Sequence, residues 1–144
     1  MSKKTISKQD CPIARALCNL GDQWTLLIAR DVMNGISTFE GFQRSLKMSR
    51  NLLTQRLRAM ELDGIIKRVI PPARKRAQYK PTQKCKDLMT TMISIINWSE
   101  KWMPDVEGRK LEVTDKNGRG VTLELLNTND EKIYELNDLS LRMI

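Results

Sequence analysis

The 144-residue sequence contains no histidine, and it has few aromatic residues and only three cysteines. Without histidine the chain lacks the commonest general base and the commonest metal ligand, so we expect no enzyme, no metal site and no cofactor. Three cysteines at unrelated spacings do not make a disulfide framework or a zinc site. No apolar run reaches the roughly 18 residues that a transmembrane helix needs, so we expect no membrane association.

The first ten residues are rich in lysine and are not followed by an apolar segment. This is not the pattern of a secretory signal, and an odd number of cysteines suits a reducing compartment. We therefore expect a cytoplasmic protein whose residues 1–9 form a flexible N-terminal arm.

The positive charge of the chain is concentrated between residues 38 and 80. This segment holds eleven of the 25 basic residues and three of the 17 acidic ones, so it carries +8, the formal net charge of the whole chain. The flanking residues sum to zero. A field this concentrated needs a polyanionic partner, and nucleic acid is the commonest one.

Hydrophobic spacing and turn residues predict the order of the secondary-structure elements. We expect helices over 10–19, 22–34, 38–46 and 50–63, then a hairpin of short strands over 65–70 and 77–80, then a long helix over 82–103. Thr38 and Ser49 are the expected N-caps of the third and fourth helices. Alternation after residue 109 and the Asn117-Gly118 pair predict a small β-meander.

This order gives the predicted fold class: mainly α with small β, a winged helix-turn-helix followed by a long C-terminal dimerisation helix. We expect residues 10–104 to form the DNA-binding and dimerisation domain and residues 105–144 to form the meander extension. The apolar stripe of the long helix, which includes Cys85 and Met92, is too long for so small a domain to cover. A second copy of the chain is the simplest partner for it.

The helix over about 49–63 has two distinct faces. Leu53, Leu57 and Met60 share one side and should face the core. The opposite side carries polar residues suited to reading bases in a major groove: Asn51, Thr54, Gln55 and Arg58.

The wing over about 65–80 and the start of this helix supply the remaining basic groups. We expect contacts to the DNA backbone or minor groove from Ser49, Arg50, Arg56, Lys67, Arg74, Lys75 and Arg76. A polar, basic helix face is often only solvated, but here the face, the cap, the hairpin and the localised charge coincide.

Several short motifs occur in a fixed order along residues 10–103. They are Cys11-Pro12, Gly21-Asp-Gln-Trp24-Thr-Leu-Leu, Phe39-Glu-Gly-Phe42, Leu53-Thr-Gln-Arg-Leu-Arg58, Glu61-Leu-Asp-Gly64 and Tyr79-Lys-Pro-Thr82. In these motifs the chain resembles the HxlR-type winged-helix transcriptional regulators. The resemblance implies a homodimer, built by the first and the long C-terminal helices, that binds double-stranded DNA at a pseudo-palindromic operator.

The sequence departs from that family pattern in two places. Lys47-Met48-Ser49 stands where the family often has Gly-Ile-Ser, and the wing is rich in arginine and lysine. Neither departure threatens the fold, and both leave the operator sequence open. A repressor is favoured over an activator.

Cys11 precedes Pro12 at a helix N-terminus, which is a position that stabilises thiolates. Some HxlR-type regulators that resemble this chain sense quinones, aldehydes or oxidants through a cysteine here, so Cys11 is a candidate redox sensor. The alternative is a cysteine buried at the dimer seam, and Cys18 and Cys85 are expected to serve packing.

Other functions are left open. A winged helix can be a protein-interaction module without specific DNA binding, and RNA binding is disfavoured because the aromatic residues of the basic module are expected in the core. A pocket for a small-molecule effector near Trp24, Trp98 and Trp102 is a further alternative, although aromatic residues at helical spacing are more often core.

Overall fold

A computed structural model describes residues 11–73, 75–108, 111–126, 128–133 and 139–142. The predicted N-terminal arm lies outside these residues. The chain divides into two compact units, residues 1–89 and 90–144. The domains expected from the sequence, residues 10–104 and 105–144, stay a prediction.

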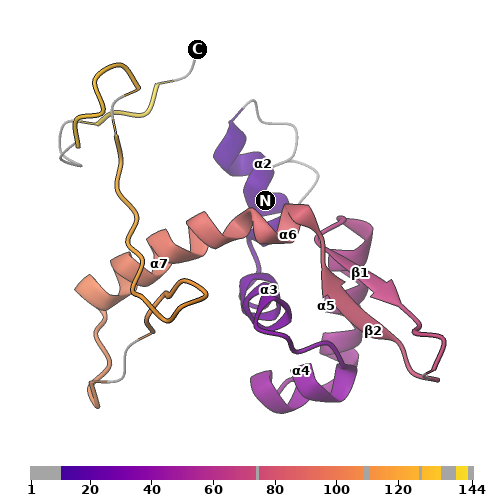
Figure 1. The fold of residues 1–144 in the computed structure, drawn as a ribbon. Helices are drawn as coiled ribbons and strands as arrows, with labels where there is room; N and C mark the ends of the chain where they lie inside the picture. Colours follow the sequence, from indigo (N-terminus) through magenta and orange to yellow (C-terminus); the bar gives the residue numbers. More distant parts are fainter. Residues whose placement is uncertain (1–10, 74, 109–110, 127, 134–138, 143–144) are drawn as a thin grey trace. The chain divides into compact units, whose positions relative to one another are not determined.

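Unit 1 holds the helix-turn-helix and the wing in the order that the sequence predicts (Figure 1). Its elements are α2 (Pro12–Leu20), α3 (Thr25–Met33), α4 (Phe39–Leu46), α5 (Arg50–Leu62), β1 (Ile66–Val69), β2 (Gln78–Pro81) and α6 (Gln83–Lys86). The two strands form an antiparallel ribbon that projects beside α5.

The predicted N-caps of α4 and α5 are confirmed. The Thr38 hydroxyl accepts a hydrogen bond from the Gly41 N–H at 3.1 Å, and the Ser49 hydroxyl accepts one from the Leu52 N–H at 3.3 Å. Lys47 ends α4 in the left-handed conformation, with φ 51° and ψ 33°. The turn between the two helices is therefore short and fixed at both ends.

The core of unit 1 lies where α3, α4, α5 and the ribbon meet. Its largest fully buried side chains are Phe42, Ile28, Leu53, Leu57, Met60, Ile65, Ile66 and Cys85. The predicted inward face of α5 and the core position of Cys85 are thereby confirmed. Tyr79 of β2 meets the Phe42 ring edge to face, with centroids 6.1 Å apart, and its N–H donates to the Ser37 carbonyl at 2.8 Å.

The single long helix predicted over 82–103 is wrong in one respect, because it is interrupted at Asp87. The structure has α6 and then α7 (Leu88–Trp102), although Asp87 keeps near-helical angles of φ −66° and ψ −18°. The first turn is fixed by other contacts: the Thr82 hydroxyl lies 2.7 Å and 2.8 Å from the carbonyl oxygens of Gly64 and Ile65. The Lys84 ammonium donates to the Asp63 carbonyl at 2.7 Å.

Unit 2 contains most of α7 and the tail that follows it. The predicted β-meander is reduced, in the described residues, to two isolated antiparallel bridges, Thr114 with Gly120 and Leu126 with Ile133. The predicted Asn117-Gly118 turn is present, with Gly118 at φ 78°. The last part of the predicted meander lies partly outside the described residues, which omit 134–138 and 143–144.

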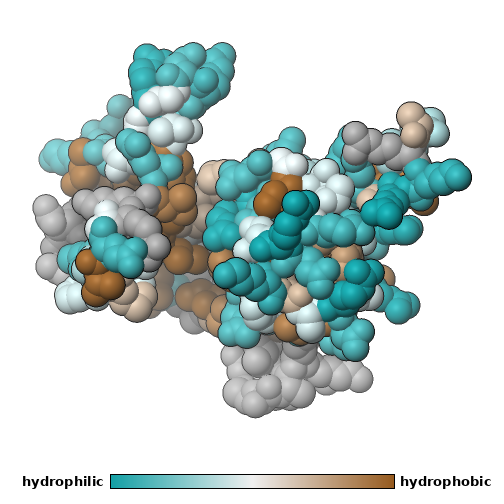
Figure 2. Space-filling model, turned by 90° about the horizontal axis from the view of Figure 1, so that it is seen from below, coloured by the Kyte–Doolittle hydropathy of each residue, from teal (hydrophilic) through white to brown (hydrophobic). Residues whose placement is uncertain are grey.

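Much of the apolar surface of α7 is uncovered in the single chain. Met92 and Ile93 are buried, whereas Ile95, Trp98 and Trp102 are 45%, 58% and 64% exposed. Within the single chain the tryptophan pair therefore lies outside the core, and its place in a dimer stays a prediction. Hydrophobic residues accordingly gather on the surface of the part that α7 and the tail form (Figure 2). Within the described residues, no helix combines the length and the hydropathy needed to cross a bilayer.

Candidate nucleic-acid interface

The exposed face of α5 carries all four predicted base-reading residues. Asn51, Thr54, Gln55 and Arg58 are exposed, and the buried residues Leu53, Leu57 and Met60 occupy the other side. Three leucine or methionine side chains in the core fix the rotation of the helix about its axis, because turning it would expose them. The polar face is thus held outward by packing.

The N-terminal end of α5 combines a hydroxyl cap with a fixed cation. Ser49 is the N-cap, and the guanidinium carbon of Arg50 lies 5.0 Å from the centre of the Phe39 ring. Stacking on an aromatic face limits the freedom of the arginine without using its N–H donors. Arg50 therefore presents its charge at a helix end that already favours anions.

Arg56 occupies a different place from the other predicted backbone-contacting residues. Its Nη1 lies 3.1 Å from Oδ2 of Asp22, and its side chain is 27% exposed. Asp22 also accepts hydrogen bonds from the N–H groups of Trp24 at 2.9 Å and Thr25 at 3.1 Å. The pair therefore joins the start of α3 to α5, inside unit 1.

Burial of Asp22 opposes its ionisation. Its hydrogen bonds with the Thr25 hydroxyl and the Trp24 N–H and the charge of Arg56 nevertheless hold the pKa of this carboxyl below its ordinary value. The Asp22 carboxylate is thus the ionised partner that Arg56 needs.

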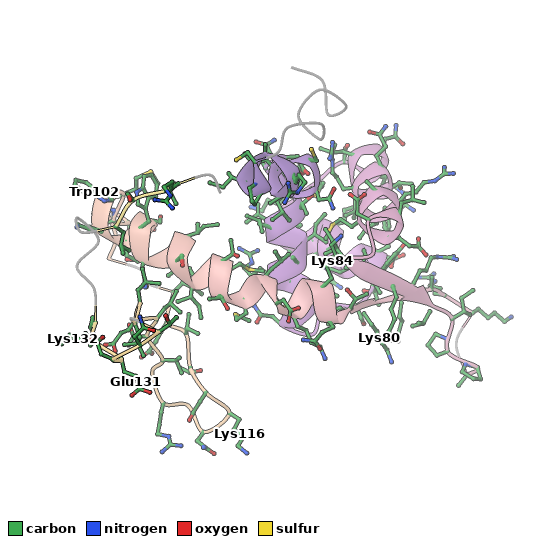
Figure 3. The ribbon with its side chains drawn as sticks, turned by 90° about the horizontal axis from the view of Figure 1, so that it is seen from above. Lys80, Lys84, Trp102, Lys116, Glu131 and Lys132 are labelled. Atoms are coloured by element: carbon green, nitrogen blue, oxygen red, sulfur yellow. The ribbon has the colours of Figure 1, made fainter. Side chains whose placement is uncertain are left out.

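The pairing of β1 with β2 places basic residues on both faces of the ribbon. Lys67 lies opposite Lys80 and Arg68 lies opposite Tyr79, and Figure 3 marks Lys80 on β2. Because successive side chains point to opposite faces of a strand, the lysine pair and Arg68 lie on different faces. Two like charges directly opposite each other destabilise a ribbon, which a nearby anion would relieve.

A shallow groove runs between the ribbon and the N-terminal ends of α4 and α5. It has a volume of about 370 Å³ and is lined by Phe39, Glu40, Arg50, Arg68, Arg76, Ala77 and Tyr79. Three arginines against one glutamate make it cationic. An adjoining hollow of about 460 Å³ shares Glu40 and Arg76 and adds Lys75.

Arg76 is already paired with an acidic group. Its Nη1 lies 3.3 Å from Oε1 of Glu40, in a pair whose side chains are 83% and 49% exposed. Such an exposed pair is weak, so a phosphate could displace the carboxylate. Lys75 is exposed, and the predicted contact residue Arg74 lies outside the described residues.

Arg68 is the residue of this surface that the sequence prediction missed. Ile66 is buried, and Arg68 follows it by two positions on the same face of β1. The prediction chose Lys67, which lies on the other face. Strand alternation counted from Ile66 was the signal that could have placed Arg68 in the groove.

None of the three cysteines is among the residues that line this groove. Cys11 is the N-cap residue of α2, is half-buried and has no side-chain capping bond. The Cys18 thiol is partly buried and donates to the Ala14 carbonyl of its own helix at 3.4 Å. Burial raises the pKa of the Cys85 thiol, which lowers the fraction present as the reactive thiolate.

Comparison with known proteins identifies relatives of the chain. Residues 19–107 match the family model described as HxlR-like helix-turn-helix. The chain is 30% identical over 102 residues to the uncharacterized HTH-type transcriptional regulator Rv3095 of Mycobacterium tuberculosis (strain ATCC 25618 / H37Rv), covering 70% of this chain and 65% of that protein. It is 33% identical over 96 residues to the HTH-type transcriptional regulator YvaP of Bacillus subtilis (strain 168), covering 65% and 89% respectively.

Solved structures resemble the whole chain as well as its helix-turn-helix part. The crystal structure of PA1607, a candidate transcription factor, superposes with a TM-score of 0.87 at 26% identity over 96% of this chain and 98% of that one. The oxidised form of the redox regulator HypR gives a TM-score of 0.57 at 25% identity, covering 63% of this chain and 96% of that chain.

Proposed function

The chain belongs to the HxlR-like helix-turn-helix family of transcriptional regulators, and on that premise we propose that it is a cytoplasmic homodimer that represses transcription at a pseudo-palindromic operator. The observation that carries the proposal is the exposed polar face of α5, held outward by the buried Leu53, Leu57 and Met60. Repression needs only that the dimer occupy a promoter.

In this proposal α5 enters the major groove. Asn51 and Gln55 can each bind adenine through a paired donor and acceptor, Arg58 can fork onto guanine, and Thr54 can meet a thymine methyl. All four side chains are exposed in the unbound chain. The helix therefore needs no rearrangement to present them.

The backbone contacts come from the α5 N-terminus and the wing. We assign them to Ser49 and Arg50 at the helix end and to Lys67, Arg68, Lys75 and Arg76 of the wing, with Arg74 as a further candidate. Arg56 is left out, because its guanidinium is engaged by Asp22. These contacts supply affinity and register and carry no direct sequence information.

The dimer is proposed to form through α2 and α7. Ile13 and Leu17, one helical turn apart on α2, are 57% and 51% exposed, and α7 exposes Ile95. Apolar stripes of this kind are normally covered by a partner. A Leu17→Glu variant should run as a monomer in size-exclusion chromatography with light scattering, while Leu62→Glu, at an exposed leucine of α5, should stay dimeric. A Leu17→Glu dimer would contradict this interface.

Selection from a random duplex library, followed by binding measurements on the selected sequence, tests the proposal. Arg58→Ala should weaken specific binding by about 1–3 kcal/mol and relax preference at one base. The matched control is Arg142→Ala, an exposed arginine of the tail, which should bind as the wild type does. Unchanged binding by Arg58→Ala would overturn the assigned face.

Salt dependence separates this function from that of a protein-interaction module. About ten phosphate contacts per dimer come from the five assigned cations of each protomer, which are Arg50, Lys67, Arg68, Lys75 and Arg76. This number gives a slope of log K against log salt near −9. A chain that shifts no duplex at any salt concentration would favour the protein-interaction module.

We further propose that Cys11 makes operator binding responsive to thiol-reactive compounds. The half-buried thiol at the start of α2 lies next to the proposed dimer helix, and the similar protein HypR is named a redox regulator. Diamide or a quinone should reduce operator binding by the wild type and not by Cys11→Ser. Equal loss in both proteins would remove Cys11 from the proposal.

A further inference from the structure

Unit 2 contains a hollow that the proposed DNA-binding surface does not use. It lies between α7 and the part of the tail around residues 123–125 and has a volume of about 370 Å³. Its lining residues are Ser94, Asn97, Trp98, Lys101, Trp102, Leu123 and Leu125. The tail passes back across α7 in Figure 1. The volume falls within the range of about 300–1,000 Å³ for small-molecule sites.

The hollow lies on the side of α7 that faces away from its buried residues. Met92 is buried, and Lys101 follows it by nine residues, which at roughly 100° per residue is half a turn around the axis. Trp98 and Trp102, four residues apart, are 58% and 64% exposed on this side. These indole rings therefore do not fill the core of the chain, and more than half of each side chain stays accessible.

The second wall of the hollow comes from outside the family region. The family match ends at residue 107, whereas Leu123 and Leu125 belong to the tail. The tail thus turns an exposed side of α7 into a two-sided hollow.

The charge of the hollow determines the kind of ligand. Among the described residues that line it, Lys101 is the one charged side chain, and no carboxylate is present. The Lys101 ammonium lies 5.2 Å from the centre of the Trp102 ring, so a cation stands directly beside an aromatic face. An anion that also carries an aromatic ring satisfies both groups at once.

We propose that this hollow binds a planar aromatic carboxylate. The ring of the ligand stacks on Trp98 and Trp102 between the leucine side chains, and its carboxylate pairs with Lys101. The Asn97 amide supplies a further donor. None of its residues belongs to the proposed operator contacts, so the two sites can be tested separately.

Isothermal titration of the full chain with 2-naphthoate and with the uncharged 2-naphthamide tests this site. The acid should bind with one molecule per chain and more tightly than the amide. Lys101→Met should weaken naphthoate binding about tenfold and leave naphthamide binding unchanged. Lys116→Met is the matched control, because Lys116 lies at the tip of a tail loop away from Trp102 (Figure 3).

The three tryptophans of the chain allow the site to be located directly. Naphthoate should shift the indole N–H resonances of Trp98 and Trp102 and leave that of Trp24 in place, with Trp102→Leu removing one shifted signal. Circular dichroism verifies that the variants are folded.

Three outcomes would overturn the proposal. The first is the absence of naphthoate binding, which is expected if a second copy of the chain covers these tryptophans. The second is equal binding of the acid and the amide. The third is equal weakening of naphthoate binding by Lys101→Met and Lys116→Met. Operator binding measured on the same preparation shows separately whether the proposed DNA function holds.

Discussion

Asp22→Ala should loosen α5 from the rest of unit 1. The Asp22 carboxylate accepts hydrogen bonds from the N–H groups of Trp24 and Thr25 at the start of α3, and it lies 3.1 Å from Nη1 of Arg56 on α5. One side chain therefore caps one helix and anchors another. Its loss should lower both the free energy of unfolding and the affinity for DNA.

The expected magnitude follows from these two roles. Loss of a capping carboxylate costs about 1 kcal/mol. The ion pair is partly buried, with side chains 20% and 27% exposed, and Arg56 Nε has no hydrogen-bond partner within the described chain. Leaving this guanidinium without its carboxylate should add about 1–2 kcal/mol. We expect a total loss of about 2–3 kcal/mol. This is a large share of the free energy of unfolding of a typical folded protein, which is roughly 5–15 kcal/mol.

Urea unfolding of the wild type, Asp22→Ala, Arg56→Met and the double variant measures the pairwise part of this loss. The coupling energy should be about 0.5–1.5 kcal/mol. Asp130→Ala is the control, because Asp130 and Lys132 form an exposed pair at 3.6 Å and its loss should cost less than about 0.5 kcal/mol. A coupling energy indistinguishable from zero would refute the anchoring of α5 by Asp22.

The same carboxylate should contribute to the acid sensitivity of the fold. Burial opposes its ionisation, but hydrogen bonds from Thr25 and Trp24 and the charge of Arg56 lower the pKa of Asp22. A lowered folded-state pKa gives stability that is present above the unfolded value of about 3.9 and is lost as pH falls through the folded value. Asp22→Asn should therefore reduce the fall in urea midpoint below about pH 4. An identical acid profile would contradict this assignment.

Three further substitutions test separate features. Lys47→Gly should stabilise the fold by about 0.5–1 kcal/mol. The left-handed φ of 51° costs a residue with a Cβ about 1–2 kcal/mol, and the greater chain entropy of glycine in the unfolded state offsets only part of this. A lower melting temperature would contradict this prediction. Glu40→Gln should raise operator affinity about fivefold by freeing Arg76 and removing a charge near phosphate, and unchanged anisotropy titrations would exclude that competition. Thr82→Val should lower the free energy of unfolding by about 1–2 kcal/mol, because the hydroxyl caps α6 and contacts two carbonyl oxygens. An unchanged urea midpoint would rule this out.

The features that the sequence predicts well are those determined within a few residues. Thr38 and Ser49 cap their helices as expected, because a hydroxyl next to a free N–H three residues on needs no distant partner. The two faces of α5 likewise follow from helical spacing and from the burial of Leu53, Leu57 and Met60. Local geometry was sufficient to predict which side of α5 is exposed.

The features that it does not predict depend on contacts between distant segments. In the sequence Arg56 is one of several cations of a basic helix, and nothing there indicates the ion pair that its Nη1 forms with Oδ2 of Asp22 at 3.1 Å. Trp98 and Trp102 read as core, because apolar spacing shows that a face is apolar and does not show whether a second element covers it. In this chain that face borders the hollow formed with the tail.

The charge of residues 38–80 shows why three-dimensional placement matters for mechanism. Counted along the chain, Lys67 and Arg68 are equivalent, but strand alternation sends Arg68 to the groove with Arg50 and Arg76, and Lys67 to the other face beside Lys80. A ribbon that is cationic on both faces repels itself when free and can meet phosphates on two sides when it lies along a duplex. The groove arginines adjoin α5 and so can fix its register, while the lysine pair adds affinity that should depend on salt and little on sequence.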